Sequence, residues 1–519
     1  MNAMMNFQAP AQPLPASPPT RAGLPLATAL MALALAGCAV GPDFKPPDAP
    51  AVSGASLYTP GAPLTLTAAA PGTGGAAQWP VVGQDIPAQW WSLFQSEALN
   101  QLIRKALQNS PNLAAAQAAL RQAQENFNAQ AGSLLYPSVT GQLGAARERA
   151  SAVSTNIPGG SLFNLYNASV NVSYTADVFG ANRRALEGQQ ALVEYQQYQL
   201  EAAYLALTAN LVTTAIREAS LRAQLQATLE LLGDQQKQLD VIERQFAAGA
   251  VSRAPLLTQR NTVAQTRAGI APLQKSLAQT RHQLSVYAGQ LPGESGLAEF
   301  QLDSLQLPQE LPLTLPSELV RQRPDIRASE ALLQQASAQV GVATANLYPQ
   351  ISLSGSYGSS ATRLGNLFGS AWNFWSLGAG LTEPIFNGGS LDAKRRAAQA
   401  AYEQAAAQYR STVLTAFQNV ADSLRAIEYD ATTLKAQAEV EALARESLAL
   451  SGTQYRLGAL SYLALLDAQR SYQQARINLV SARAARYADT AALFQALGGG
   501  WWNRGPLPQL PLALQTSDH

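Results

Sequence analysis

The sequence predicts a mixed α and β fold that is mainly helical and in which one unit occurs twice. Three observations support this prediction: a duplicated order of landmarks, four runs of alternating apolar and polar residues, and long stretches without proline. Each observation reports on a different level of structure, because repeats set the architecture while periodicity separates strands from helices.

The duplication is visible at an offset of about 210 residues. A segment rich in Ala and Gln ends at Tyr136-Pro137 in the first half and at Tyr348-Pro349 in the second half. Further along, Gly249 and Gly458 occupy matching turns, and each is followed by a Leu-Leu pair and then by Gln-Arg. We therefore expect a first repeat over residues 97–290 and a second repeat over residues 317–498.

Four runs change from helical to alternating periodicity, as a strand with two different faces requires. In the longest run Tyr166, Val170 and Val172 share one face, whereas Asn167 and Ser169 share the other. Each run spans about ten residues, which is the length of a strand in a transmembrane barrel. The predicted strands cover residues of about 136–146, 165–179, 348–358 and 372–386. Aromatic residues stand near the strand ends, where interfacial girdles form: Tyr136, Tyr166, Tyr174, Phe179, Tyr348, Trp372, Trp375 and Phe386.

Four strands are too few to close a membrane barrel, because known barrels begin at about eight strands and an open edge in lipid leaves backbone groups unpaired. The chain must therefore oligomerise, and three copies supply an even number of strands. Three copies with four strands per chain would give a 12-stranded transmembrane β-barrel. Alternation alone also fits a pair of soluble hairpins.

Long helices are predicted where proline is absent, between Pro158 and Pro255 and again between Pro384 and Pro506. A helix over residues 183–247 reaches about 100 Å at about 1.5 Å per residue, several times the thickness of a bilayer. Its Gln, Ser, Thr and Arg content is too high for lipid. The helices are therefore expected to stand in the periplasm and to pack against each other.

The N-terminus has the pattern of a signal peptide over residues 1–37, with Arg21 as its one charged residue and an apolar stretch over residues 24–36. That stretch is too short to span a bilayer. It ends in Leu35-Ala36-Gly37-Cys38, which resembles the lipobox of bacterial lipoproteins. We expect Cys38, the sole cysteine, to carry a covalent lipid that includes palmitate. Residues 38–96 are expected to form a tether and an equatorial region.

Charge and composition argue against several classes of protein. Without Arg21 the chain has 34 basic and 34 acidic residues, so it lacks the positive charge that nucleic-acid binding needs. Its two histidines are far apart, no Gly-Lys step of a phosphate-binding loop occurs, and no metal-ligand spacing is present. We predict that the chain is not an enzyme and has no metal and no cofactor beyond the lipid.

Several motifs in this order resemble the outer-membrane factor family, the TolC-type efflux proteins, and in particular its lipoprotein branch. They are the lipobox with the following residues 40–47, Trp90-Trp91, Arg323-Pro324-Asp325-Ile326, both Tyr-Pro steps, and Leu465-Leu466-Asp467-Ala468-Gln469-Arg470. The resemblance implies a homotrimer in which twelve strands form one transmembrane β-barrel and the helices form a long periplasmic α-helical barrel. A belt of equatorial segments surrounds the helices, and here it includes the connector 291–316 and the tail 499–519.

The two turns at Gly249 and Gly458 are the expected functional positions. Glycine permits the left-handed conformation that ends a helix, and the serines that follow can cap the returning helices. A good helical hairpin alone could account for both features. The resemblance implies adaptor docking at Gly249, Val251, Ser252, Gly458, Leu460 and Ser461.

The resemblance also implies an aperture gate near these turns. Its candidates are Arg253, Tyr455 and Asp467, and three copies of Asp467 would form a ring of carboxylates that attracts cations. Asp467 could equally be a surface charge. Pro255 stands where family members often carry a gating residue, so the resemblance does not identify which contacts lock the gate in this chain.

The implied function is that of the outer-membrane exit channel of a tripartite multidrug efflux system. The channel would conduct small toxic compounds passively, with a periplasmic adaptor, an inner-membrane proton-driven pump and outer-membrane lipid as partners. One alternative is the outer-membrane duct of a type I protein secretion system. Another, of a different class, is a structural coiled-coil lipoprotein without a pore.

Overall fold

The computed structural model describes residues 39–48, 58–60, 63–151, 160–294 and 296–505. The predicted signal peptide, Cys38 and most of the predicted C-terminal tail lie outside the described residues. The chain divides into two compact units. A sheet unit contains residues 134–185 and 341–395 together with the residues up to 42, and a helical unit contains residues 43–133, 186–340 and those from 396 onward.

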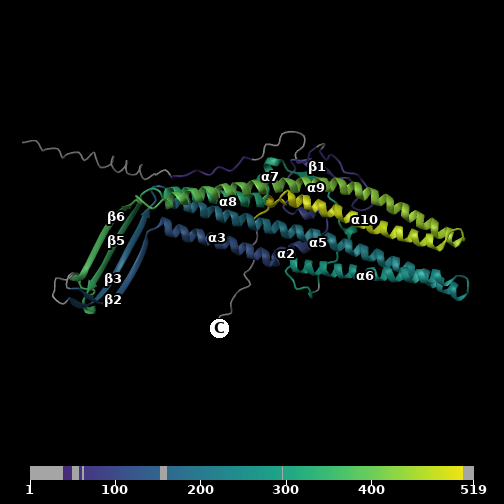
Figure 1. Ribbon diagram of the computed structural model, residues 1–519, viewed down its shortest axis with the longest axis horizontal. Helices are drawn as coiled ribbons and strands as arrows, with labels where there is room; N and C mark the ends of the chain where they lie inside the picture. Colours follow the sequence, from purple (N-terminus) through teal and green to yellow (C-terminus); the bar gives the residue numbers. More distant parts are fainter. Residues whose placement is uncertain (1–38, 49–57, 61–62, 152–159, 295, 506–519) are drawn as a thin grey trace, which may run out of the picture. The chain divides into compact units, whose positions relative to one another are not determined.

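The sheet unit contains a four-stranded antiparallel sheet in the order β2-β3-β5-β6, drawn in blue and green in Figure 1. Its strands are β2 (Ser138–Ala150), β3 (Ser161–Ala176), β5 (Gln350–Ala361) and β6 (Asn373–Thr382). The first and third strands begin directly after the two Tyr-Pro steps. Chain order and spatial order agree, so the duplicated hairpins lie next to each other in the sheet.

Two predicted strand ends are wrong, because β3 stops at Ala176 rather than 179 and β6 stops at Thr382 rather than 386. The carboxylate of Asp177 accepts the backbone N–H groups of Asn182 and Arg183 at 3.0 and 2.9 Å, which turns the chain toward the next helix. Pro384 has no N–H to donate to a strand ladder. The hairpin of β2 and β3 is longer than predicted at its turn. Strand β2 continues to Ala150 rather than 146, and β3 begins at Ser161 rather than 165.

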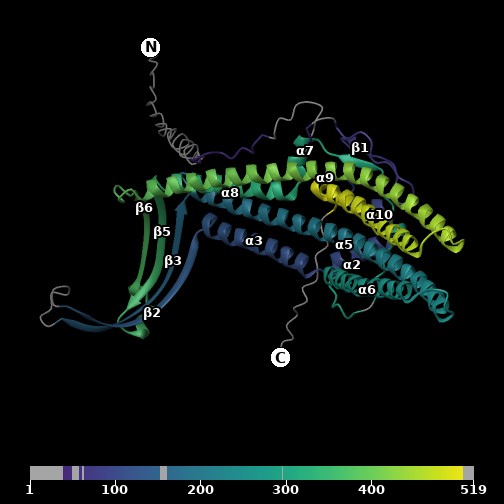
Figure 2. The same cartoon turned by 45° about the vertical axis from the view of Figure 1, so that its right-hand side comes forward.

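The helices have matching lengths in the two halves, as a duplication requires. The 67-residue helices α5 (Ala181–Ala247) and α9 (Ser390–Arg456) are each followed by a 35-residue helix, α6 (Arg253–Tyr287) and α10 (Tyr462–Ala496). Within each half the long and the shorter helix run side by side as a hairpin (Figures 1 and 2). The remaining helices are α2 (Glu97–Asn109), α3 (Pro111–Leu135), α7 (Pro316–Gln322) and α8 (Pro324–Ala345). Among the described residues, none of the helices is both long and apolar enough to cross a bilayer.

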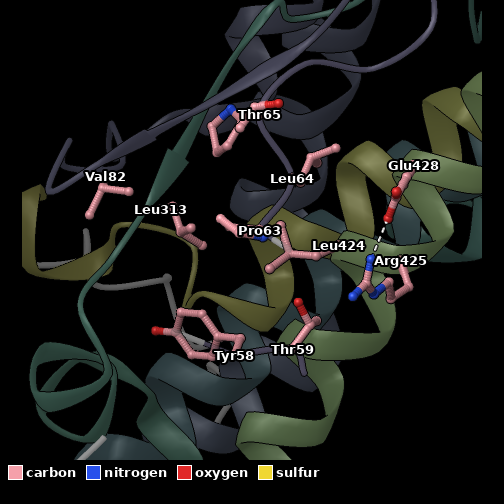
Figure 3. Close-up of a pocket in the computed structure, with 11 residues that line it drawn as sticks. Tyr58, Thr59, Pro63, Leu64, Thr65, Val82, Leu313, Leu424, Arg425 and Glu428 are labelled. Carbon is pink, nitrogen blue, oxygen red and sulfur yellow. Dashed lines mark hydrogen bonds and ion pairs between the residues drawn. The ribbon is translucent and has the colours of Figure 1, made fainter. Parts of the chain in front are cut away.

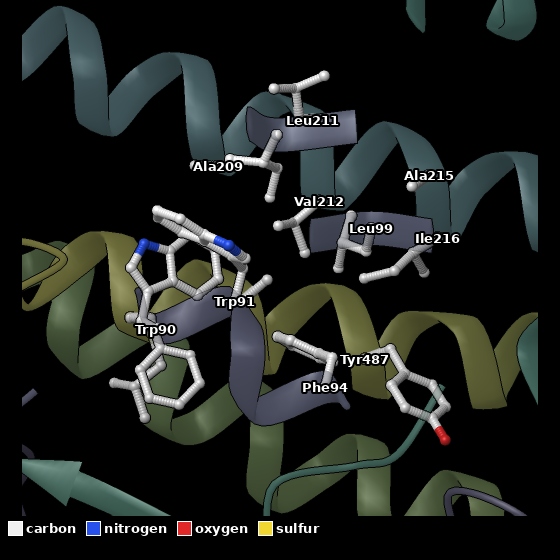
Figure 4. Close-up of a cluster of buried hydrophobic side chains, with 14 of the residues drawn as sticks. Trp90, Trp91, Phe94, Leu99, Ala209, Leu211, Val212, Ala215, Ile216 and Tyr487 are labelled. Carbon is white, nitrogen blue, oxygen red and sulfur yellow. The ribbon is translucent and has the colours of Figure 1, made fainter. Parts of the chain in front are cut away.

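The core of the helical unit forms where segments from the whole chain meet. The short parallel strands β1 (Trp79–Val82) and β4 (Glu310–Leu313) pair, and the 3-10 helix Trp90–Phe94 packs its aromatic rings against α5 and α10 (Figure 4). Trp90 is fully buried and stacks on Phe494 with 5.5 Å between the ring centroids. Burial of such large apolar surface is the main stabilising contribution here.

The Arg-Pro-Asp-Ile motif links this core to the ends of two helices. Arg323 is buried and donates to the carboxylate of Asp325 at 3.0 and 2.6 Å. Its other nitrogen donates to the carbonyl oxygen of Ala496 at 2.8 Å, at the end of α10. The arginine therefore satisfies a helix C-terminus whose last carbonyls have no partner within the helix.

Candidate functional sites on the sheet and at the helical tips

The sheet has one apolar face and one polar face. Its register pairs Val139 with Val172 and Tyr357 with Trp375, so apolar residues meet apolar residues across all four strands. This face is open, since Leu143 and Leu377 are 83% and 81% exposed in the single chain. A folded soluble protein rarely leaves such a face uncovered.

The opposite face carries small polar side chains that bond to one another across the strands. The hydroxyl oxygens of Ser138 and Ser173 lie 2.7 Å apart, and those of Ser356 and Ser376 lie 2.8 Å apart. A sheet with these two faces is suited to separate lipid from a water-filled lumen. Among the described residues, strands β2 and β6 each have one neighbour, so their outer edges need strands from other copies.

The two helical tips have the same backbone geometry. In the first, Gly249 has a φ of 75°, and the N–H groups of Gly249 and Ala250 donate to the carbonyl oxygens of Phe246 and Gln245 at 2.9 and 2.8 Å. In the second, Gly458 also has a φ of 75°, and the equivalent bonds are 3.0 and 2.9 Å long. Both are Schellman turns, which need the left-handed glycine that the sequence predicts.

The caps that begin the returning helices differ between the tips. Ser461 accepts the N–H of Ala464 at 3.3 Å, as expected for a helix N-cap. Ser252 stands at the N-cap position of α6, but its side chain makes no capping bond, contrary to the symmetry of the two sequences. The glycines and serines of both tips are exposed, and Val251 and Leu460 are half-buried. No atom approaches within 4 Å of a Cβ built on Gly249 or Gly458.

The three gate candidates lie near the tips without contacting one another in the described part of the chain. Arg253 is exposed at the first position of α6. The Tyr455 ring packs against Tyr462 with 5.7 Å between the centroids. Asp467 is exposed and lies 3.8 Å from Arg470, one turn further along α10. A pair this exposed and this long contributes little to stability.

A link between the two hairpins was missed by the sequence analysis. The hydroxyl of Tyr462 donates to the side-chain oxygen of Gln259, and the amide of Gln259 donates to the backbone oxygen of Gln235 at 2.7 Å. Burial raises the pKa of Tyr462, with a smaller contribution from Tyr455, so the hydroxyl keeps its proton and can donate at physiological pH. The only sequence signal for this link was the repeated Gln-Arg after each Leu-Leu pair.

The second copy of that signal makes a similar contact. Gln469 donates to the side-chain oxygen of Gln238 on α5 at 2.6 Å, and Arg476 forms an ion pair with Glu230 at 2.6 Å. Helices α5, α6 and α10 together enclose a polar groove of about 380 Å³, which Thr262, Gln265 and Gln473 help to line. The groove and the exposed tips offer both hydrogen-bonding and apolar surface to a partner.

A second groove, of about 340 Å³, lies beside the core and is shown in Figure 3. It is mainly apolar, with Leu64, Leu313 and Leu424 in its wall. Its charged residues, Arg425 and Glu428, form an ion pair at 2.6 Å with each other, which leaves little charge to bind a ligand. This groove follows the seam between the N-terminal segment and α9.

This chain is similar to known proteins over most of its length. The profile of the family described as "Outer membrane efflux protein" matches residues 102–290 and 315–499. The pyoverdine export outer membrane protein OpmQ of Pseudomonas aeruginosa is 32% identical over 422 residues, which are 80% of this chain and 87% of OpmQ. The toluene efflux pump outer membrane protein TtgC of Pseudomonas putida is 30% identical over 487 residues, which are 92% of this chain and 96% of TtgC.

Solved structures agree. The outer-membrane channel OprN superposes with a TM-score of 0.80 at 29% identity, covering 89% of this chain and all of OprN. CusC, whose crystal structures concern the formation of a transmembrane channel, superposes with a TM-score of 0.77 at 26% identity. The superposition again covers 89% of this chain and all of CusC. The predicted fold class of a trimeric barrel with a helical extension is therefore confirmed. The predicted outer-membrane location and role in efflux transport are confirmed as well. These relatives support a channel over a structural coiled coil without a pore. The chain belongs to the outer membrane efflux protein family.

Proposed function

We propose that three copies of this chain form the exit duct of a tripartite pump for small toxic compounds, taking substrate from an adaptor and a proton-driven pump in the inner membrane. The observation that carries the proposal is the face of small polar residues that extends across all four strands, which suits a wide aqueous lumen through which compounds diffuse. The duct itself conducts passively and performs no catalysis.

Substrate choice lies outside the duct in this proposal. The relatives carry names that refer to pyoverdine, to toluene and, for CusC of Escherichia coli, to cations, although all are similar to this chain over most of its length. A wide lumen lined by Ser, Thr, Asn and Gly has few groups with which to discriminate among such compounds. The pump therefore selects, and the duct accepts what it receives.

Adaptor docking is proposed at the two tips. The six residues named above are exposed or half-buried, and the polar groove between α5, α6 and α10 begins about three helical turns from them, at Thr262 and Arg470. An adaptor that ends in a helical hairpin could place apolar side chains on Val251 and Leu460 and polar ones in the groove. The Tyr462 to Gln259 bond would hold the tips closed until docking, and a ring of Asp467 would favour cations.

We propose that the lipid on Cys38 anchors the chain at the end of the sheet where β3 leads into α5. Two residues after Cys38, the N–H of Val40 donates to the carbonyl oxygen of Phe179 at 3.1 Å. The Phe179 ring stacks on Tyr348 with 4.9 Å between centroids, beside the start of β5. The described chain therefore begins beside an aromatic girdle, where a membrane interface belongs and where a lipid anchor is suited to act.

The test is accumulation of an efflux dye in a deletion strain complemented with this gene, together with co-purification of partners. Gly458→Pro cannot adopt the φ of 75° that the turn requires, so we expect dye accumulation at the level of the deletion strain with trimers intact. Gly458→Asn is the matched control, since Asn tolerates the left-handed conformation.

Equal accumulation in the Gly458→Pro and wild-type strains would refute docking at this tip. Equal accumulation with and without the gene would refute the efflux role. Recovery of an ATP-driven exporter and its secreted protein would favour the secretion duct instead.

A further inference from the structure

The hairpin of β2 and β3 continues beyond the rest of the sheet. The last pair between β3 and β5 joins Tyr166 to Ala361, whereas β2 and β3 stay paired for five more positions, as far as Ala150 and Ser161 (Figure 2). The register is unbroken over this extension, so every second residue still points to the same face.

The apolar face of this hairpin has the height of a membrane. On β3 it begins at Tyr174 and ends at Tyr166, and nine residues are about what a barrel strand needs to cross a bilayer at its usual tilt. The apolar band of an outer-membrane barrel is about 25 Å tall and has aromatic residues at both borders. Tyr166 therefore marks the border on the side away from the helices.

Two arginines occupy the next positions on that same face. Arg147 lies opposite Asn164 and Arg149 lies opposite Leu162, two and four residue pairs beyond the pair of Ala145 and Tyr166. Both side chains are exposed, and neither forms an ion pair with any part of the chain that the structure describes.

The other charges at this end of the sheet are few. Glu148 pairs with Phe163 on the opposite face, and Arg363 follows Ala361 by two residues in the next hairpin. The sequence between 150 and 161 contains no charged residue. The outward-facing side of this rim is therefore positive, with no carboxylate on the face that carries Arg147 and Arg149.

We propose that Arg147 and Arg149 form a binding surface for the phosphate groups of the phosphorylated glycolipid of the outer leaflet, lipid A. A guanidinium presents a planar set of donors that fits phosphate, and the position just past the aromatic border is the level at which lipid headgroups lie. Arg363 adds positive charge at the same rim. The inference takes the outer-membrane placement as given and does not depend on what the duct conducts.

The experiment uses detergent-purified full-length trimers titrated with bisphosphorylated lipid A and with its monophosphorylated form, with binding followed by native mass spectrometry. We expect Arg147→Gln with Arg149→Gln to weaken binding of the bisphosphorylated form roughly tenfold, given two charges near a phosphate layer. The monophosphorylated form should bind wild type more weakly. Arg147→Lys with Arg149→Lys should restore part of the affinity.

Glu148→Gln is the matched control, because it changes the charge of the same strand on the opposite face. It should leave lipid A affinity within about twofold of wild type. If the double Gln variant does not assemble, Arg149→Gln alone is measured in the same way.

Unchanged affinity of the Gln variant, or equal binding of both lipid A forms, would overturn the proposal. Complete competition by millimolar inorganic phosphate would instead identify a site for the free anion, which also overturns it.

Discussion

A pair of carboxyl groups between α9 and α10 makes the stability of the helical unit depend on pH. Asp430 on α9 faces Asp489 on α10 and is half-buried, and its Oδ2 atom is buried without a hydrogen-bond donor. Burial, followed by the effect of Asp489, raises the pKa of Asp430 to about 7. Arg486 on α10 opposes this rise, but its own donors are used by Thr67, Gln78 and backbone oxygens of the N-terminal segment.

The direction of the pH effect follows from the raised pKa. Between an ordinary aspartate pKa of 3.8 and about 7, the folded chain binds this proton more tightly than the unfolded chain. The free energy of unfolding therefore falls as the pH rises through this window and is lower above it. A shift of about three units corresponds to about 4 kcal/mol, and solvent screening of a half-exposed group reduces this to about 1–2 kcal/mol.

Asp430→Asn keeps the shape of the side chain and removes the titration. We expect the variant to unfold at the same temperature as wild type at pH 5 and at a higher temperature at pH 8. The assay is the tryptophan fluorescence of detergent-solubilised trimers heated at one fixed scan rate. Asp422→Asn, an exposed site on the same helix, is the control and should follow wild type at both pH values. Equal wild-type and Asp430→Asn curves at pH 8 would refute the reasoning.

Three further predictions concern the tips and the anchor. Ser461→Ala should lower the local stability of α10 by about 1 kcal/mol, whereas Ser252→Ala should have little effect because Ser252 makes no capping bond. Hydrogen exchange at the starts of α10 and α6 measures both effects. Equal effects would contradict the difference in capping. Tyr462→Phe removes the hydroxyl that bonds to Gln259 and should raise single-channel conductance in planar bilayers; an unchanged conductance would separate this bond from closure. Cys38→Ser should abolish incorporation of labelled palmitate while trimers still reach the outer membrane, and loss of membrane trimers would show that the lipid is required for assembly.

Local periodicity was enough to predict the four strands of the sheet unit, the long helices and their duplication. Alternation identified the strands because a strand that separates lipid from water must differ between its two faces at every residue. The two turns could be located from Gly249 and Gly458, since a left-handed backbone conformation strongly favours glycine. The predicted ends of β3 and β6 were less accurate, because they do not depend on periodicity. Asp177 ends β3 by accepting backbone N–H groups at the start of α5, and Pro384 ends β6 because it has no N–H to donate.

What the sequence alone determined is the four strands of the sheet unit, the long helices and the tight turns, because each depends on residues close together in the chain. The strands β1 and β4 were not predicted, since they pair across more than 200 residues. Only the tertiary structure decided which helices meet. The 67-residue helices α5 and α9 carry Ala and polar residues around most of their circumference, so no single apolar stripe identifies a neighbour. The contacts of Tyr462 with Gln259 and of Asp430 with Asp489 join residues 203 and 59 positions apart, and their pairing depends on how the helices align along their length.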